Sequence, residues 1–498
     1  MMGKQIGGGT SVPSKEYNGA GVSTPSSHHE NGTKVPAPED KSGTATLVAD
    51  RSTTLVVPPG YKQTKVGVVP EDWEVVRFNN IFERVTRKNT TNNTNVLTIS
   101  AQHGLINQKD FFNKSVASKD LSGYILLKKG EFAYNKSYSS GYPMGAFKRL
   151  NFYDEGVLSS LYIYFKIKDD NSDFYEQYFE AGLMNKEIYK IAQEGARNHG
   201  LLNMSVKEFF HDMLIIKPPL IEQQKIAQIL TTWDDAISKQ EALIEAKEQL
   251  KKGLMQKLLS GEVRFGITGA ATSVAADSLE DNATKVASPE WEEVRMGDIG
   301  TTYGGLTGKK AEDFGVGNAK YVTYKNIFDN SQLNIDLFEN VKIAPEEPQN
   351  KVEYGDILFT TSSETPEEVG MSSVLLDNID ELYLNSFCFG YRVNDIEVLN
   401  PHFARFYFRS FYMRDKISRL AQGSTRFNLS KLQVMKIKVK LPPKQEQQKI
   451  AQVLTTADKE IALLKEELET LKEQKRGLMQ RLLSGEVRTN KTRRREND

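Results

Sequence analysis

The stretch Pro218-Pro219-Leu-Ile-Glu-Gln-Gln-Lys-Ile-Ala-Gln opens a segment that ends in Leu258-Leu259-Ser-Gly-Glu-Val-Arg264, and the segment returns later in the chain. The second copy runs from Pro442-Pro443 to Arg488. An ungapped alignment of 218–264 with 442–488 gives 27 identities in 47 positions, most of them at the two ends. A repeat of this length indicates that the chain consists of two halves built to one plan.

Each copy predicts a long helix. Apolar residues recur at alternating spacings of four and three, which is the pattern of a coiled-coil seam. The prolines fit a first helical turn and Ser-Gly fits a helix end, so each helix is bounded on both sides. We expect the two helices to pack antiparallel. The seam residues are Ile226, Leu230, Trp233, Ile237, Gln240, Ile244, Lys247, Lys251, Leu254 and Leu258 in the first copy and Ile450, Leu454, Ala457, Ile461, Leu464, Leu468, Leu471, Lys475, Leu478 and Leu482 in the second.

The regions before the two helices share only short landmarks. Pro70-Glu-Asp-Trp73 has a counterpart in Pro289-Glu-Trp291, so the repeated unit starts well before each helix. Each region is long enough to form its own core. The predicted fold class is α+β, with two mixed α/β domains separated by a long antiparallel two-helix coiled coil and an internal pseudo-two-fold repeat. The predicted boundaries are 1–60 for a disordered N-terminal extension, 61–217 for the first domain, 218–264 for the central helix, 265–284 for a linker, 285–441 for the second domain, 442–488 for the distal helix and 489–498 for a basic tail.

Composition limits the class of protein. The 498 residues carry 65 basic and 65 acidic side chains, so the net charge gives no general signature of a nucleic-acid-binding protein. Counting charges, 61–217 hold 21 basic and 18 acidic residues, and 285–441 hold 19 and 22, so attraction to phosphate has to be local. The single cysteine, Cys388, excludes an internal disulfide, and no run approaches the ~20 apolar residues of a membrane span. We expect a cytoplasmic protein with no membrane contact.

Motifs for catalysis are missing. An adenine methyltransferase needs an Asn/Asp-Pro-Pro-Tyr/Phe turn to hold the flipped base. The nearest match, Asn400-Pro401-His402-Phe403, lacks the second proline and is typical of a helix N-cap. No Gly-x-x-x-x-Gly-Lys-Ser/Thr loop occurs, which excludes an ATP-driven motor, and the six histidines form no spaced metal set. The chain is predicted to be non-catalytic, with no cofactor and no metal of its own.

The helix starts Pro-Pro-x-x-Glu-Gln-Gln-Lys-Ile-Ala and the helix ends Gly-Leu-Met-Gln-x-Leu-Leu-Ser-Gly-Glu-Val-Arg resemble those of the specificity subunits of type I restriction–modification systems. Thr302-Tyr303-Gly304-Gly305-Leu306-Thr307 is similar to the Gly-Gly-Thr turn of their second recognition domain, whereas Arg84-Val85-Thr86-Arg87-Lys88 departs from that turn. The resemblance covers about 61–490. It implies that 61–217 and 285–441 are target recognition domains, each reading one half of a bipartite site in double-stranded DNA, with the helices as a spacer.

The resemblance also implies partners. Two modification subunits, which bind S-adenosylmethionine and methylate adenine, dock on the helices, and separate restriction and translocase subunits use ATP and Mg. Exposed-type residues repeat between the helices beyond what a seam requires, and we expect them to form the docking interface. Gly253 and Gly477 each cost about 1 kcal/mol of helix propensity, which favours a close helix approach or a partner contact. The predicted interface residues are Glu222, Gln223, Gln224, Lys225, Gly253, Met255, Glu446, Gln447, Gln448, Lys449, Gly477 and Met479.

Candidate DNA contacts gather in three places, and Lys309-Lys310 and Lys325-Asn326 are additional candidates. Between Lys128 and Arg149, five basic residues interleave with tyrosines and serines. The glycine-bounded loops 195–200 and 423–428 precede their helices by similar distances, and each carries an arginine with amide side chains. Basic and hydroxyl groups reach phosphates, whereas Arg and Asn read base edges. The predicted contacts are Lys128, Lys129, Lys136, Tyr138, Lys148, Arg149, Arg197, Asn198, His199, Lys309, Lys310, Lys325, Asn326, Ser424, Thr425, Arg426 and Asn428.

Two other classes of protein stay open at this point. The chain could be a single-chain restriction–methylation enzyme with divergent motifs, which binding of S-adenosylmethionine to the isolated chain would reveal. It could instead be a coiled-coil scaffold whose domains do not bind DNA. Retention of defined duplexes by the partner-bound complex, but not by the helices alone, separates the scaffold from a DNA-reading subunit.

Overall fold

A computed structural model describes residues 57–112, 117–194, 202–265 and 290–489. The repeated segments form its two longest described helices, α6 (Leu220–Ser260) and α12 (Lys444–Leu483). Pro219 and Pro443 are the N-cap residues of these helices. Gly261 and Gly485 follow the helix ends with φ of 78° and 77°, a left-handed conformation that favours glycine and stops the helix.

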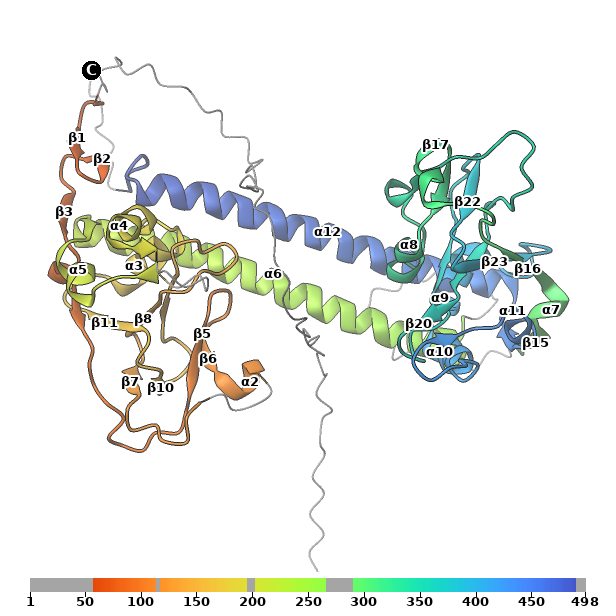
Figure 1. Cartoon of the computed structure of the whole chain (residues 1–498), viewed down its shortest axis with the longest axis horizontal. Helices are drawn as coiled ribbons and strands as arrows, with labels where there is room; N and C mark the ends of the chain where they lie inside the picture. The colour runs from red at the N-terminus through yellow and green to blue at the C-terminus, as the bar shows by residue number, and fades with distance from the viewer. Residues whose placement is uncertain (1–56, 113–116, 195–201, 266–289, 490–498) are drawn as a thin grey trace, which may run out of the picture. The chain divides into compact units, whose positions relative to one another are not determined.

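Helices α6 and α12 pack side by side in antiparallel orientation (Figure 1). Every predicted seam position is buried or half-buried, which confirms the coiled-coil interpretation. Polar pairs within the seam fix its register. The Nε2 atom of Gln240 donates to the Leu464 carbonyl oxygen (3.1 Å), and Lys247 pairs with Glu460 (2.7 Å). As the residue number increases along α6, the number of its partner on α12 decreases, as an antiparallel pair with a single register requires.

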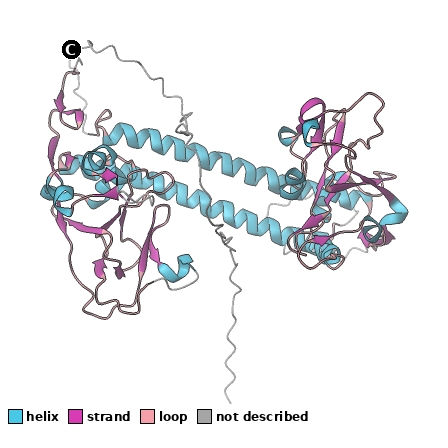
Figure 2. Ribbon diagram, viewed as in Figure 1, coloured by secondary structure: helices cyan, strands magenta, loops and turns pink. Residues whose placement is uncertain are grey.

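Each half contains a four-stranded antiparallel sheet, and the strand order is the same in both. Figure 2 shows strands in both halves, at the two ends of the helix pair. If the four strands of each sheet are numbered along the chain, their spatial order is 1-4-2-3 in both halves. This shared topology confirms the predicted internal repeat. In spatial order, the sheet of the first half consists of β4 (Phe82–Arg84), β11 (Ile163–Ile167), β8 (Phe132–Asn135) and β9 (Ala146–Arg149). The sheet of the second half consists of β16 (Gly300–Gly304), β23 (Cys388–Val393), β19 (Ile357–Thr360) and β21 (Ser372–Val374).

A two-stranded ribbon connects each sheet to its long helix. In both halves the later strand of the ribbon leads directly into the prolines that start the helix. A short helix that follows the sheet packs against the long helix of its own half. The ribbons are β3 (Glu74–Arg77) with β14 (Leu214–Lys217) and β15 (Glu292–Arg295) with β25 (Lys438–Leu441), and the packing helices are α3 (Ser172–Glu180) and α9 (Pro401–Tyr407).

The main core of each half includes both long helices. In the first half, a cluster of phenylalanines around Phe132 and Phe165, with stacked rings 5.4 Å apart, packs against Ile226 at the start of α6 and Leu482 at the end of α12. The second core joins the start of α12 to the end of α6 in the same way. Each domain is therefore built onto one end of the helix pair.

Outside the shared sheet the two domains differ. The first adds hairpins and a short helix, namely β1 (Tyr61–Thr64), β2 (Gly67–Pro70), β5 (Leu97–Ser100), β6 (Gly104–Asn107), α2 (Gln108–Phe112), β7 (Ile125–Lys128) and β10 (Glu155–Leu158). The second adds a three-stranded sheet of β18 (Glu339–Val341), β17 (Phe314–Val322) and β22 (Leu382–Leu384). Smaller helices are α1 (Phe78–Ile81), α4 (Asn185–Ile191), α5 (Val206–His211), α7 (Met296–Ile299), α8 (Tyr324–Asp329), α10 (Phe411–Ser418) and α11 (Lys431–Val434).

Candidate nucleic-acid interface

The loop 422–428 of the second domain presents an exposed arginine on a braced backbone. Gln422 and Asn428 exchange two backbone hydrogen bonds (3.0 and 2.8 Å) that close the loop. Gly423 has φ of +137°, and a Cβ there would lie 2.1 Å from the Arg426 carbonyl oxygen, so the turn requires glycine. Strand β24 (Phe427–Asn428) then pairs with β20 (Ser362–Ser363). The predicted contacts Ser424, Thr425, Arg426 and Asn428 are all exposed.

Helix α8 lies beside this loop. The Tyr324 hydroxyl donates to the Ser362 carbonyl oxygen (2.7 Å), which ties α8 to the strand that pairs with β24. Burial raises the pKa of Tyr324, and the nearby positive charge of Arg426 acts in the opposite direction. Lys325 is exposed on the same helix. Asn326 is buried, and its side-chain amide donates to the Asn334 carbonyl oxygen and accepts from the Asn334 backbone amide. The structure therefore leaves Lys325 exposed on the helix that contacts β20 and gives Asn326 a structural role.

The described strands that flank the equivalent segment of the first domain are attached in a similar way. Arg197, Asn198 and His199 lie outside the described residues. The strands on either side, β12 (Gln193–Glu194) and β13 (Leu202–Asn203), pair with each other. The Leu202 amide donates to the Lys136 carbonyl oxygen (3.0 Å), as the Leu429 amide donates to the Thr361 carbonyl oxygen (2.8 Å) in the second domain. Lys136 and the exposed Tyr138 thus follow the strand end to which β13 is joined.

The remaining basic residues of the 128–149 stretch separate into two groups. Lys148 is buried and pairs with Glu180 of α3, while Arg149 pairs with Asp173 and Glu176 of the same helix (2.6 Å each). These pairs hold α3 against β9, so both cations are engaged within the fold. Lys128 and Lys129 are exposed, but they precede β8, at the end opposite to Lys136.

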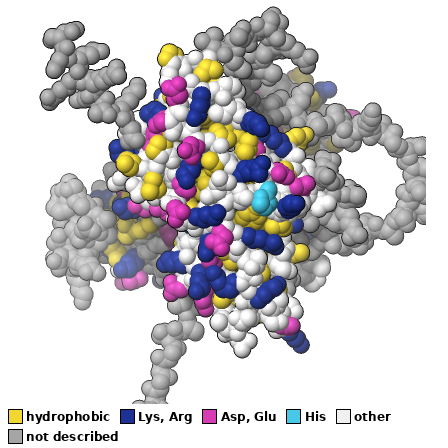
Figure 3. Space-filling view, turned by 90° about the vertical axis from the view of Figure 1, so that its left-hand side faces the viewer, with side chains coloured by type: hydrophobic (Ala, Val, Ile, Leu, Met, Phe, Trp, Pro, Cys, Tyr) yellow, Lys and Arg dark blue, Asp and Glu magenta, His cyan; other side chains and the backbone are white. Residues whose placement is uncertain are grey.

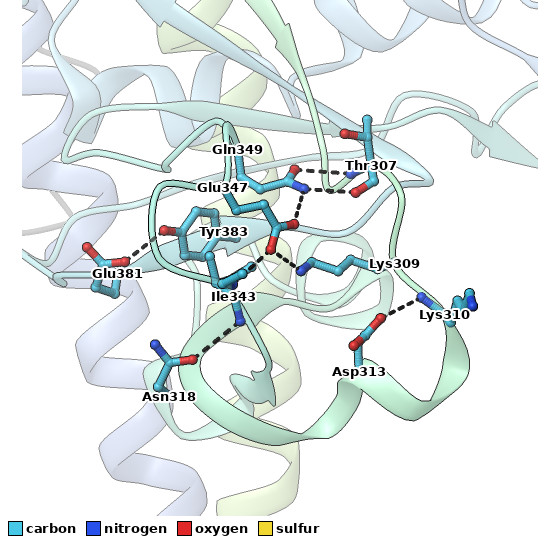
Figure 4. A network of polar contacts seen from close by, with 11 residues as sticks. Thr307, Lys309, Lys310, Asp313, Asn318, Ile343, Glu347, Gln349, Glu381 and Tyr383 are labelled. Carbon is cyan, nitrogen blue, oxygen red and sulfur yellow. Dashed lines mark hydrogen bonds and ion pairs between the residues drawn. The ribbon is translucent and has the colours of Figure 1, made fainter.

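In the second domain Lys309 is also engaged. It pairs with Glu347 at 2.5 Å, and this contact is the main cause that lowers the pKa of Glu347 to about 2. Figure 4 shows Gln349 linking the same carboxylate to Thr307. Lys310 is exposed, and its backbone amide donates to Asp313 (2.9 Å). Only Lys310 of this predicted pair is available to a ligand.

Four predicted interface residues are buried at the two ends of the helix pair. Glu222 accepts hydrogen bonds from Trp73 Nε1 (2.9 Å) and from Nε and Nη2 of Arg488 (2.9 and 2.8 Å). Glu446 likewise accepts from Nε and Nη2 of Arg264 (2.7 and 2.8 Å). In the second arrangement the indole nitrogen of Trp291 has no hydrogen-bond partner among the described residues, and the Arg264 guanidinium lies over the Trp291 ring, 5.6 Å from its centre. We name these arrangements the first clasp (Trp73, Glu222 and Arg488) and the second clasp (Trp291, Glu446 and Arg264).

The neighbouring glutamines are buried for a similar reason. Gln223 accepts from the Asn171 amide (2.9 Å), and Gln447 accepts from the Asn400 amide (2.8 Å), so each fixes the start of α3 or α9. The repeated Glu-Gln pair is thus explained by the fold. Among the predicted interface residues, Gln224, Lys225, Gln448, Gly253 and Gly477 are exposed, and Lys449, Met255 and Met479 are half-buried.

The glycines within the helices do not mark a close approach of α6 to α12. A Cβ built at Gly253 or Gly477 meets no atom within 4 Å, so both positions face open space. Of the two explanations that the sequence offered, the helix approach is wrong and the partner contact remains. The face that carries the glycines is the one we assign to partners below.

Charges of both signs cover the end of the first domain. Figure 3 shows Lys and Arg side chains spread over this face with Asp and Glu between them. Among the described residues, no group of His, Cys, Asp and Glu could hold a metal ion. None of the described helices is long and apolar enough to cross a membrane.

Sequence reasoning missed the clasps and a second pair of carboxylates, Asp234 and Asp458. Both were visible as identities between the two helices, since Asp234 aligns with Asp458 and Arg264 with Arg488. A signal that could have found them is the antiparallel register, in which residue numbers of facing positions add up to the same value. Asp234–Lys475 and Lys251–Asp458 are two such facing pairs of opposite charge.

The chain therefore consists of two domains of one topology, each attached to one end of an antiparallel helix pair. Residues 289–473 match the family model described as Type I restriction modification DNA specificity domain. The MjaVIII specificity subunit of a type I restriction enzyme, from Methanocaldococcus jannaschii, is 25% identical over 84% of this chain and 94% of its own length. The putative MjaX specificity subunit of the same organism is 26% identical over 86% and 96%.

A chain from a solved type I restriction–modification structure has the same fold. It matches with a TM-score of 0.50 and 15% identity, over 84% of this chain and 99% of its own. The family model and the near full-length relatives agree with the fold, and the chain is similar to the specificity subunits of type I restriction–modification systems. A specificity subunit is the non-catalytic, DNA-recognising component of such a system.

Proposed function

We propose that each half of the chain reads one half of a bipartite DNA site. Residues 61–217 and 285–441 act as the two target recognition domains, and the helices at 218–264 and 442–488 set the distance between the half-sites. The observation that carries this proposal is the repeat itself. One sheet topology occurs at both ends of a helix pair held in a single register, and a loop is joined to the same strand end in each domain.

Loop 422–428 is the proposed base reader of the second domain. Its exposed Arg426 is the side chain suited to bidentate contacts with guanine, and Asn428 is suited to adenine. Lys325 supplies a phosphate contact beside it. By the equivalence of the two attachments, residues 195–200 with Lys136 and Tyr138 form the reader of the first domain. Lys128, Lys129 and Lys310 are assigned to peripheral phosphates because they are exposed and belong to neither loop.

Replacing Arg426 by alanine is expected to weaken binding of the cognate duplex by about 1–3 kcal/mol, or roughly 5- to 150-fold, because a guanidinium read-out is lost. Sequence preference should relax in one half-site only. Titration of duplexes with single substitutions in either half-site measures both effects. Arg419→Ala is the matched control, since Arg419 is an exposed arginine that pairs with Asp415 four residues earlier on the same helix. Equal binding by wild type and Arg426→Ala would exclude the loop from the DNA site.

We further propose that two methyltransferase subunits dock on the exposed repeated faces of the helices, around Gly253 and Gly477. Those subunits would carry S-adenosylmethionine, and restriction subunits, where present, would use ATP and Mg. The complex would act in the cytoplasm, where the DNA lies. Each docking face contains a glycine that the fold itself does not require, because a Cβ there meets nothing. A backbone without a side chain allows a partner to approach closely.

The double change Gly253→Ala and Gly477→Ala separates docking from folding, because the two effects have opposite signs. Alanine should stabilise the isolated chain by up to about 1 kcal/mol per site through helix propensity. It should weaken assembly with the methyltransferase subunit at least about tenfold. Chemical unfolding of the free chain and titration with the partner measure the two quantities. A more stable variant that assembles as tightly as wild type would place the docking face elsewhere.

A further inference from the structure

Each long helix carries one aspartate that contacts two other elements. In the first half, Asp234 of α6 accepts from Gln177 Nε2 of α3 (2.7 Å) and pairs with Lys475 of α12 (2.5 Å). One carboxylate therefore links the recognition domain, its own helix and the opposite helix. We name Asp234, Gln177 and Lys475 the first joint.

The second half repeats this arrangement. Asp458 of α12 pairs with Arg405 of α9 (2.5 Å) and with Lys251 of α6. Asp458 aligns with Asp234, and Lys251 aligns with Lys475, in the repeat. We name Asp458, Arg405 and Lys251 the second joint. Two independent occurrences at equivalent positions indicate a common requirement of both halves.

Each joint lies twelve residues after the clasp glutamate of the same helix, since Glu222 precedes Asp234 as Glu446 precedes Asp458. Twelve helical residues span roughly 18 Å. A domain held at one point of a helix can pivot about that point, whereas a second attachment about 18 Å away fixes its direction. Clasp and joint therefore add two polar attachments to the core that each domain shares with the helix pair, and together they favour one angle between the domain and the helices.

We propose that Asp234 and Asp458 are positioning residues that make the complex strict about the spacing of its two half-sites. The inference rests on the proposed function, because spacing has meaning only for a chain that reads a bipartite site. Adding one base pair between the half-sites moves the second by about 3.4 Å and rotates it by roughly 34°. A domain held at a fixed angle cannot bind the displaced half-site, whereas a domain released at its joint can turn and bind it.

The two joints differ in charge, and this predicts unequal effects. The domain side of the first joint is Gln177, a neutral amide, while that of the second is Arg405, whose side chain is 9% exposed. Changing Asp458 removes the carboxylate that Arg405 and Lys251 share. Arg405 then keeps its hydrogen bond to Gln332 (2.7 Å) and its place over the Phe406 ring (4.4 Å to the ring centre), but it loses its counter-charge. We expect the larger relaxation from the second joint.

The test uses the full chain assembled with its methyltransferase partner and a set of duplexes with the cognate half-sites and spacers changed by one or two base pairs. The variants are Asp234→Asn, Asp458→Asn and Gln177→Leu, the last of which leaves the Asp234–Lys475 pair in place. We expect the preference for the cognate spacer over its one-base-pair neighbours to fall at least about fivefold. The bases preferred within each half-site should stay the same.

Glu241→Gln is the control, because Glu241 pairs with Lys472 across the helices without touching either domain (3.1 Å). It should keep the full spacer preference. Thermal unfolding is measured for each variant. If Asp458→Asn is unstable, the folded Gln177→Leu protein provides the test in its place. Joint variants that retain the wild-type spacer preference would overturn the inference. A wild-type complex that ignores spacer length would instead overturn the proposed function.

Discussion

Replacing Arg488 by alanine is expected to lower the free energy of unfolding by about 3–5 kcal/mol, because it leaves a buried carboxylate without its counter-charge. Glu222 is 0% exposed and receives both Nε and Nη2 of Arg488. The guanidinium also lies over the Trp73 ring, 5.8 Å from its centre. The first clasp joins the start of the first domain, the start of α6 and the segment after α12. Its loss therefore loosens three parts at once, which urea unfolding at neutral pH measures.

Arg481→Ala provides the matched comparison. Arg481 lies on the same helix end and pairs with Glu486 (2.9 Å), but both side chains are more than half exposed. An exposed pair is typically worth about 0–1 kcal/mol, so this change should be nearly neutral. If the two arginine variants lost the same stability, the clasp would be an ordinary surface ion pair.

Acid should weaken the first clasp. Burial on its own raises the pKa of Glu222, but the hydrogen bonds from Arg488 and Trp73 outweigh it and hold the pKa below its usual value of 4.5. A depressed pKa means that the stabilisation is present above about pH 4.5 and is lost as the pH falls through the lower folded value. Glu222→Gln should therefore reduce the dependence of unfolding free energy on pH in the acid range. A wild-type slope in that variant would contradict this assignment.

The parts of the fold that follow from local periodicity were predictable. The seam of α12 could be read from Ile450 to Leu482 because a four-three spacing has one structural meaning over so many turns. Asn400 was predicted as an N-cap, and its side chain accepts from the backbone amides of His402 and Phe403 (2.9 and 3.2 Å). The antiparallel arrangement followed from two similar helices in one chain.

The candidate site was less predictable because a sequence does not show where a charge finds its partner. Lys148 and Arg149 carry the composition of a DNA-binding patch, but acids of α3, more than twenty residues away, neutralise them. Glu222 and Gln223 are polar residues at a helix start whose sequence is typical of an exposed surface. Both are nevertheless buried, because the domain that precedes them covers them. Burial of a polar residue depends on tertiary contacts, which no local pattern encodes.

Lengthening both helices together should move the preferred distance between the half-sites. The register of α6 against α12 means that an insertion in one helix alone would displace half of the seam. One heptad after Ala242 and one after Lys465 keep the seam on either side, including the pairs Glu248–Lys465 (2.7 Å) and Lys247–Glu460 (2.7 Å). Seven helical residues add about 10 Å, which corresponds to about three base pairs.

Three base pairs also rotate the second half-site by roughly 100°, since DNA turns once in about 10–10.5 base pairs. A single paired heptad should therefore weaken binding to every spacer, at least about a hundredfold, because the two domains can no longer face their half-sites together. Three paired heptads add about 31 Å, close to one DNA turn, and should restore binding at a spacer longer by nine or ten base pairs. Selection from duplexes with fixed half-sites and random spacer length measures both variants. Retention of the original spacer by the three-heptad protein would mean that the helices do not set the distance.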